Sequence, residues 1–308
     1  MPLSLDASMT PMSEKSYSAP MAEQPMVVDA WVNIFPERFA AEWTAKRENS
    51  DVGMLFGEDL GRGATVEQLV AAMDDAGVQT GILTSGLRPP DRAHHKGMYA
   101  AEDFIAVAEA HPGRFAVSVT VDKVERPTDN VRRIRELVGD EHVVMARVTP
   151  LVEQYDLNHR LYYPVYAACE EAGLPVSINV GIPGPKVRSH CQHPELLEDV
   201  LIDFPDLTVV GAHMGHPYEA LLIQYMLKFD RLHLMTSAYL AKYMDESLVR
   251  FMDSSRGRGR VWFASDHPVL PVSKALEAAR ALPLSEESMA EFLGASAARV
   301  LGVPVPAG

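Results

Sequence analysis

Eight short hydrophobic runs recur along the chain, and longer amphipathic segments separate them. Each run is rich in β-branched residues and nearly continuous in its hydrophobicity, which is typical of a parallel strand covered on both faces. The segments between them carry apolar residues at helical spacing. "TVEQLVAAMDDAG" (65–77), for example, begins with an N-capping threonine and ends on glycine. The runs cover residues 27–34, 79–84, 114–120, 142–149, 175–181, 207–213, 231–237 and 260–266.

The alternation of eight strands with helices predicts an α/β fold, the (β/α)8 TIM barrel. An open doubly wound sheet is the structural alternative, but it requires a glycine-rich phosphate-binding turn after an early strand, and the sequence has none. Residues 35–64 form a long insertion with four glycines after the first strand, and we expect this insertion to lie over the barrel mouth as a lid. Residues 1–25 are rich in Met, Ser and Pro and are predicted to be a flexible, mobile N-terminal arm, which leaves 26–308 as a single barrel domain.

The overall charge limits the kinds of partner. With 28 basic and 42 acidic residues the chain has a formal net charge of −14. An acidic chain without a basic cluster argues against nucleic acid and against an anionic membrane surface, but not against an anionic small molecule. No stretch approaches the roughly 18 apolar residues of a membrane span, and the first 25 residues lack the basic start and apolar block of a signal peptide. These observations predict a cytoplasmic protein with a small-molecule substrate.

Polar residues occur at the ends of the predicted strands, which is where the active site of a TIM barrel forms. His213 ends the sixth run and Asp266 ends the eighth. A partly desolvated carboxylate needs a partner or a function, and both side chains can point at the mouth of a closed barrel. We interpret them as a catalytic acid–base pair in which Asp266 orients the imidazole. A buried pair that only ties two strands together is the alternative.

Nine further residues near these strand ends are predicted to bind the substrate. The basic loop after the fifth strand suits capture of a substrate carboxylate, with a solvated loop as the alternative. His216 precedes Pro217, so it is either a second histidine of the site or a residue at the start of a helix. The nine residues are Trp31, Asn33, Arg147, Asn179, Lys186, Arg188, His190, His216 and Tyr239.

Three motifs together resemble a known family. "GAHMGHP" (211–217), "WFASDHP" (262–268) and "FLGASAARVLG" (292–302) are similar to the amidohydrolase 2 branch of the metal-dependent hydrolase superfamily, and the resemblance runs from about residue 27 to the end. This branch includes aminocarboxymuconate-semialdehyde decarboxylase, resorcylate-type decarboxylases and pyrone dicarboxylate lactonase. The resemblance implies a (β/α)8 barrel, hydrolysis or non-oxidative decarboxylation of small carboxylated and often aromatic substrates, and a homodimer.

The family's metal ligands are mostly replaced in this sequence. The family usually supplies two ligands from strand 1, a histidine from strand 5 and an aspartate from strand 8. The corresponding residues here are Trp31, Asn33, Asn179 and Asp266, of which Asp266 alone keeps the family's residue type. The strand 6 histidine, which the family uses in catalysis, is present as His213.

These replacements lead us to expect no cofactor and no metal ligand. Tryptophan offers no lone pair, and amide oxygens are weak donors for zinc. Asn33 and Asn179 can instead donate to an oxyanion, and Trp31 can supply a flat apolar wall. The alternative is a single divalent metal at a rebuilt site formed by Asp266, His213, His216 and a loop histidine such as His190.

Three functions remain open. The main prediction is a metal-independent hydrolase of a small cyclic or aromatic ester, lactone or amide, in which His213 acts with Asp266 and Arg147 anchors a carboxylate. The first alternative is a decarboxylase, a lyase of a small aromatic or unsaturated acid, in which His213 protonates the ring carbon. The second alternative is a non-catalytic binding protein that retains the barrel.

Overall fold

The computed structural model describes residues 25–35, 64–86, 99–122 and 124–303, together with positions 37, 41, 45 and 46. Eight parallel strands lie side by side in the order in which they follow one another along the chain. Each strand overlaps one of the eight predicted runs. The strands are β1 (Val28–Val32), β2 (Thr80–Gly86), β3 (Phe115–Thr120), β4 (Val143–Val148), β5 (Val176–Asn179), β6 (Val209–Ala212), β7 (Leu232–Met235) and β8 (Val261–Trp262).

The last strand meets the first and thereby completes the barrel. The amide of Asp266 donates to the carbonyl of Trp31 at 2.9 Å, and the amide of Asn33 donates to the carbonyl of His267 at 2.8 Å. These bonds lie just beyond β8, so they bring the ends of the first and eighth runs together. The predicted (β/α)8 TIM barrel is confirmed.

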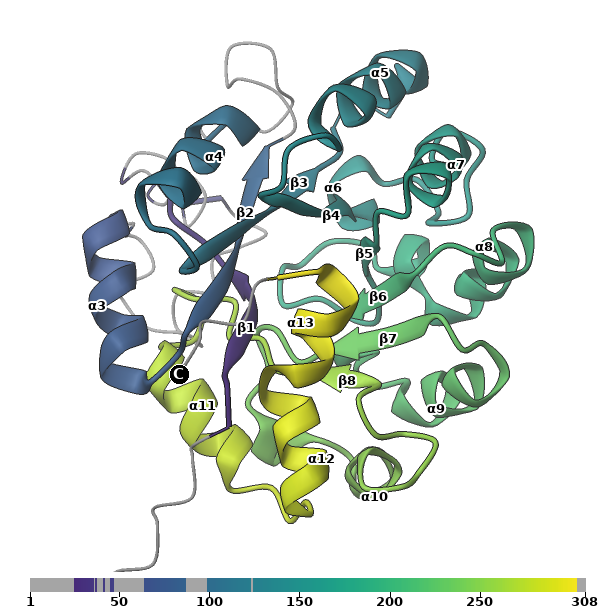
Figure 1. The fold of residues 1–308 in the computed structure, drawn as a ribbon. Helices are drawn as coiled ribbons and strands as arrows, with labels where there is room; N and C mark the ends of the chain where they lie inside the picture. The colour runs from purple at the N-terminus through teal and green to yellow at the C-terminus, as the bar shows by residue number, and fades with distance from the viewer. Residues whose placement is uncertain are drawn as a thin grey trace, which may run out of the picture.

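Helices surround the barrel on its outer side (Figure 1). α3 (Val66–Ala76), the first helix that the structure describes in full, shows how the sequence sets helix ends. Thr65 and Gln68 form a capping box, with the Gln68 amide donating to the Thr65 hydroxyl at 3.2 Å, and Gly77 ends the helix with a φ of 77°. The helices are α3 (Val66–Ala76), α4 (Ala101–Ala110), α5 (Pro127–Leu137), α6 (Pro150–Glu153), α7 (Tyr163–Ala172), α8 (Leu197–Asp203), α9 (Glu219–Lys228), α10 (Glu246–Met252), α11 (Val272–Arg280), α12 (Glu286–Ala290) and α13 (Ser296–Leu301).

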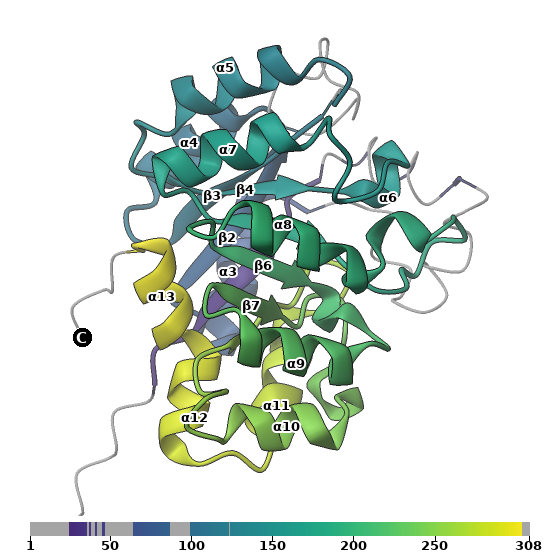
Figure 2. The ribbon, with the colours of Figure 1, turned by 90° about the vertical axis from the view of Figure 1, so that its right-hand side faces the viewer.

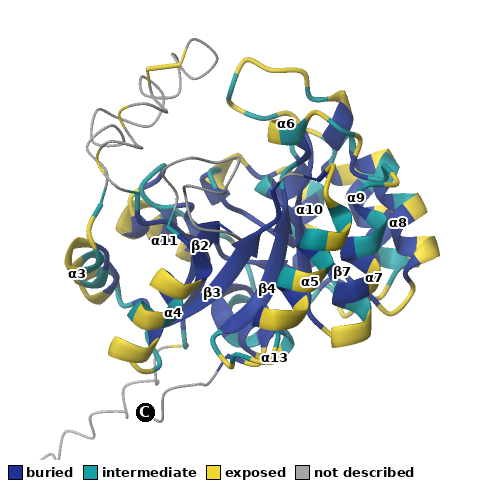
Figure 3. Cartoon of the chain, turned by 90° about the horizontal axis from the view of Figure 1, so that it is seen from above, coloured by how far each residue is buried: buried dark blue, intermediate teal, exposed yellow. Residues whose placement is uncertain are grey.

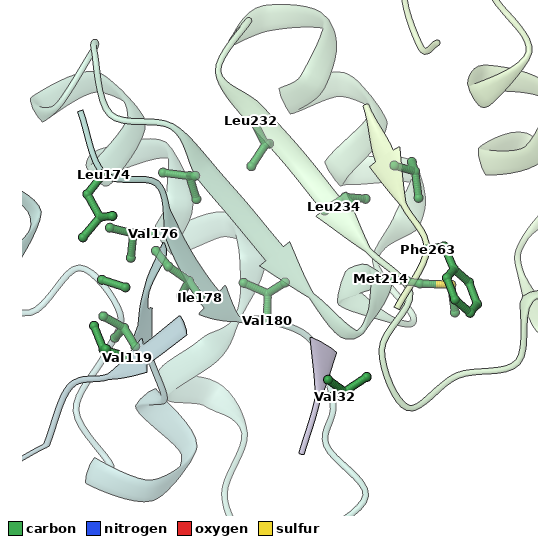
Figure 4. Packing of buried hydrophobic residues seen from close by; sticks show 14 of the residues in the cluster. Val32, Val119, Leu174, Val176, Ile178, Val180, Met214, Leu232, Leu234 and Phe263 are labelled. Atoms are coloured by element: carbon green, nitrogen blue, oxygen red, sulfur yellow. The ribbon is translucent and has the colours of Figure 1, made fainter. Parts of the chain in front are cut away.

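The alternation of side chains along the strands divides the buried residues into two sets. The strands are buried except at His233 of β7, which is partly exposed (Figure 3). On β5, Val176 and Ile178 belong to the cluster that packs between the strands and the helices (Figure 4), so Ser177 and Asn179 face the barrel axis. A second cluster fills the barrel interior, and it includes Met145, two residues before Arg147 on β4. Alternation therefore also turns Arg147 inward.

The C-terminal helices cover the end of the barrel from which the strands start. α12 continues through a short π-helix (Glu291–Ala295) into α13, and Ala297, Ala298 and Leu301 of α13 pack against the interior cluster. Figure 2 shows α13 at this end and α6 at the opposite end. The strands finish at the α6 end, so the candidate site lies there.

Two predicted segments fall outside the described residues. The arm predicted over 1–25 is described at position 25 alone, and the lid predicted over 35–64 at a few isolated positions. Both stay predictions. Among the described residues, no helix is long and apolar enough to cross a membrane.

Gly294 provides a test of the packing between the C-terminal helices and β1. A Cβ at this position would lie 2.7 Å from the amide nitrogen of Val28 and 2.8 Å from the carbonyl oxygen of Met26. Backbone atoms cannot turn aside as a flexible side chain can, so Gly294→Ala is expected to lower the free energy of unfolding by about 1–3 kcal/mol. Gly139→Ala is the control, because nothing lies within 4 Å of its added Cβ. Urea denaturation followed by circular dichroism measures both variants, and equal stability of the two would contradict this packing.

Candidate active site

Three neighbouring strands carry polar residues on the face that points at the barrel axis. In the register of the sheet, Thr120 of β3 lies opposite Arg147 of β4, and Arg147 lies opposite Ser177 of β5. Asn179 follows two residues after Ser177 and therefore shares its face. All four side chains are buried. They form a polar layer inside the barrel, near the ends of the strands.

Arg147 places a guanidinium within this layer. The side chain is fully buried, and its Cζ lies 3.1 Å from the centroid of the Trp31 ring. None of its three side-chain nitrogens has a hydrogen-bond partner among the described residues. Burial lowers the pKa of Arg147 to about 9, and the charge of Asp266 opposes this shift, so the group is cationic at neutral pH. Stacking covers the face of the guanidinium and leaves its N–H edge for an anion.

His213 follows β6 with a φ of 59° and is held by the end of β7. Its backbone amide donates to the Ser237 hydroxyl at 3.0 Å, and its Nδ1 lies 3.0 Å from the Ser237 carbonyl oxygen. A carbonyl oxygen can only accept a hydrogen bond, so Nδ1 carries the proton of the neutral ring. Nε2 then accepts a hydrogen bond from the side-chain amide of Asn179 at 3.2 Å. Burial lowers the pKa of His213 to about 4, against the effect of the Ser237 hydrogen bond. The ring is therefore neutral at pH 7.

Asp266 also has a φ of 59° and belongs to a chain of hydrogen bonds from β1. The indole of Trp31 donates to Oδ1 of Asn33 at 3.0 Å, and the Asn33 amide donates to Oδ1 of Asp266 at 2.7 Å. Burial raises the pKa of Asp266 to about 7, and both the Asn33 hydrogen bond and the charge of Arg147 oppose the shift. The carboxyl group of Asp266 is thus fixed by Asn33.

These contacts differ from the predicted acid–base pair. Ser237 takes the orienting position that was expected for Asp266, and Asp266 interacts with Asn33 instead. Both His213 and Asp266 leave their strands in a left-handed conformation, which removes them from the regular alternation of side chains. His213 consequently turns to the end of β7, whereas Asp266 turns to the end of β1.

Trp31 also differs from its predicted role as an open wall. The guanidinium of Arg147 lies over its ring, and the His213 ring lies 5.0 Å away at a tilt of 40°. The tryptophan therefore packs against both the cationic guanidinium of Arg147 and the neutral ring of His213. The structure brings six predicted residues together: Trp31, Asn33, Arg147, Asn179, His213 and Asp266.

The other predicted residues lie in the surrounding loops. His216 Nδ1 lies 2.7 Å from Glu219 Oε1 at the start of α9, as expected of a residue that contacts the start of a helix. Tyr239 donates to the carbonyl of Ile182 at 3.1 Å. Three more are exposed residues of the loop after β5: Lys186, Arg188 and His190. A role of these five in substrate binding stays a prediction.

Two residues of the site had no predicted role. Asp29 Oδ1 accepts from the amide of Ser265 at 2.8 Å and from the amide of Trp31 at 3.2 Å, and burial raises the pKa of Asp29 to about 7. A carboxylate inside an apolar run was a signal that could have identified it. Ser237, which holds His213, gave no such signal, because a serine after a strand is common.

A family model described as amidohydrolase matches residues 28–303. An uncharacterized TIM-barrel protein from Bordetella bronchiseptica is 23% identical with a TM-score of 0.73, over 90% of this chain and 98% of that chain. 5-Carboxyvanillate decarboxylase from Sphingomonas paucimobilis is 18% identical with a TM-score of 0.70, over 91% and 100% of the two chains. Dihydroxybenzoic acid decarboxylase from Polaromonas sp. JS666, crystallised with manganese and the inhibitor 2-nitroresorcinol, is 13% identical with a TM-score of 0.69, over 91% and 97%. None of the curated proteins compared with the chain matches it.

The manganese in that decarboxylase corrects the prediction of a site without a cofactor, because it points to a divalent metal in this fold. The described residues of this chain do not fit such an ion. No three His, Cys, Asp or Glu side chains among them are arranged to hold a metal, and the Asn33 amide directs a donor, not an oxygen, at Asp266. The rebuilt site is likewise not formed by its four predicted members: Asp266, His213, His216 and His190.

The family match spans the whole barrel. It begins at the first residue of β1 and ends after α13, so it includes every strand end that contributes to the site. The solved structures, all below 25% identity, show the same fold. The chain belongs to the amidohydrolase family.

Proposed function

We propose that this chain is a lyase that removes carbon dioxide from a small aromatic carboxylic acid without oxidation. The observation that carries the proposal is the buried guanidinium of Arg147, whose N–H groups have no partner among the described residues. Two decarboxylases of the same fold, named for 5-carboxyvanillate and dihydroxybenzoic acid, support the same substrate class. The decarboxylase alternative is therefore preferred to hydrolysis of an ester, lactone or amide.

Arg147 would bind the carboxylate of the substrate. A guanidinium presents its donors in a planar fork that matches the two oxygens of a carboxylate. Trp31 supports this fork, because the central carbon of the guanidinium lies 3.1 Å from the centroid of the indole ring. An ester or lactone carbonyl has no negative charge to offset a buried cation, so a carboxylic acid fits the site better.

His213 would move the proton that replaces the carboxylate. When the bond to carbon dioxide breaks, its electrons remain on the ring carbon, which then takes up one proton. The neutral Nε2 of His213 first accepts a proton from a substrate hydroxyl or from water and then transfers it to that carbon, and the oxyanion or hydroxide left behind takes up a proton from solvent. One carboxylate and one proton are consumed, and one C–H bond and one carbon dioxide are formed. Ser237 holds the ring in the tautomer with Nε2 unprotonated, and the substrate hydroxyl or water would replace the Asn179 amide as the hydrogen-bond partner of this atom.

Replacement of Arg147 tests the carboxylate anchor. Arg147→Met removes the charge at similar bulk, so kcat/KM for carbon dioxide release is expected to fall roughly 100-fold or more. Arg250→Met is the control, because Arg250 is an exposed arginine of α10 on the outside of the barrel. Carbon dioxide release from 5-carboxyvanillate and from hydroxybenzoates, measured with and without added manganese, gives the rates. The proposal fails if Arg147→Met keeps full turnover, or if the protein hydrolyses aryl esters and releases no carbon dioxide from the acids.

Replacement of His213 tests the proton transfer. His213→Ala is expected to lower kcat by roughly 100-fold or more, which is the usual contribution of general acid–base catalysis, with little change in KM. His142→Ala provides the control, because His142 directly precedes β4 and so lies at the opposite end of the barrel. Steady-state kinetics together with circular dichroism separates loss of chemistry from loss of fold. A His213→Ala protein that is folded and fully active would rule out this role, and a wild type that binds benzoate without turnover would favour the non-catalytic alternative.

A further inference from the structure

The hydroxyl groups on the strands next to Arg147 point to a binding element that extends beyond the arginine. We propose that Thr120 and Ser177 complete a carboxylate-binding seat around Arg147 and make the site select for a negatively charged ligand. This inference rests on the proposed function, because that function supplies the carboxylate.

The sheet register places the two hydroxyls on either side of the arginine. Thr120 is the partner of Arg147 across the β3–β4 pair, and Ser177 is its partner across the β4–β5 pair. Directly opposed residues of parallel strands point to the same face, and neighbouring strands are about 4.8 Å apart. Val119 and Ile178 belong to the outer cluster, which confirms that Thr120 and Ser177 face inward. The base of the Arg147 side chain is therefore flanked on each side by a residue that carries a hydroxyl group.

Both hydroxyls lack a hydrogen-bond partner among the described residues, although both side chains are buried. A buried polar group without a partner is costly, and natural proteins rarely keep several together. Further buried hydroxyls without a partner occur on β2 to β5 and at the end of β4. The serine and threonine hydroxyls of this kind are those of Thr84, Ser118, Thr120, Thr149 and Ser177.

The opposite side of the barrel is different. There the Thr236 hydroxyl donates to the carbonyl of Ala264 at 2.8 Å, and the Ser237 hydroxyl accepts from the amide of His213 at 3.0 Å. Among the described residues, the threonine and serine hydroxyls without a partner are thus concentrated on β2 to β5 and their ends, near the buried cation, whereas the atoms without a partner on the β8 and β1 side are Asp29 Oδ2 and His267 Nδ1. This asymmetry is what a ligand-binding seat requires and what a uniformly packed barrel interior would not show.

The chemistry of the seat favours a carboxylate over a neutral group of the same shape. A guanidinium offers donors only, and the two hydroxyls can add one donor each. A carboxylate has two oxygens with about four acceptor positions, so it can satisfy the fork and both hydroxyls at once. A carboxamide would turn its NH2 group toward the N–H edge of Arg147, where donor faces donor.

Binding of benzoate and of its neutral analogue benzamide tests the seat without catalysis. Isothermal titration of the full-length protein is expected to show tighter binding of benzoate. Ser177→Ala and the nearly isosteric Thr120→Val should each weaken benzoate binding about tenfold or more and leave benzamide binding nearly unchanged. Thr120→Ser, which keeps a hydroxyl, should restore most of the affinity. In the Arg147→Met background, Ser177→Ala should add little, because the anion is no longer held.

A buried serine on the outer face of β2, which it shares with Leu83, gives the control. Ser85 lies on β2 and is buried, but its hydroxyl donates to the carbonyl of Ser118, so Ser85→Ala should not alter benzoate binding. Unchanged benzoate affinity in folded Ser177→Ala and Thr120→Val would overturn the seat, as would an equal loss for benzoate and benzamide. The result of this binding experiment does not depend on whether the protein is a decarboxylase. Hydroxyl-dependent binding of benzoate without release of carbon dioxide from any acid would retain the seat and reject the decarboxylase.

Discussion

A positive charge enclosed in the barrel is the constraint on which the rest of the site depends. An ion transferred from water into a protein interior loses several kcal/mol of solvation even after relaxation. Arg147 recovers part of this through the face of Trp31 and part through the charge of Asp266. Asp266 in turn is fixed by Asn33 at the junction of β8 and β1. The contacts that close the barrel therefore also hold the carboxylate that balances the charge of Arg147.

The same dependence explains which parts of the molecule could be predicted from the sequence. Hydrophobic runs and helix caps are local, so all eight strands and the two ends of α3 were predicted from neighbouring residues. The inward position of Arg147 follows from the same alternation. The partner of His213 could not be predicted in this way, because it depends on one backbone angle that turns the ring toward Ser237.

The hydroxyl groups beside Arg147 were missed for a related reason. Ser177 and Thr120 are ordinary strand residues when each run is considered alone. Their importance follows from the register, which places both residues next to Arg147. Thr120 lies 27 positions before Arg147 in the chain, and Ser177 lies 30 positions after it. The presence or absence of a divalent metal could also not be predicted from the sequence pattern. A shared barrel does not determine which donors stand at its strand ends, so the family and the local chemistry have to be established separately.

The left-handed backbone at His213 and Asp266 has a consequence for laboratory evolution. Residues other than glycine cost of order 1–3 kcal/mol each in this conformation, and two of the five such residues in the described part of the chain are His213 and Asp266 of the candidate site. Glycine would relieve the strain at either position. A selection for thermal stability alone would therefore favour exchanging both groups for glycine, and would yield a barrel that withstands heating better but has no chemistry at its mouth.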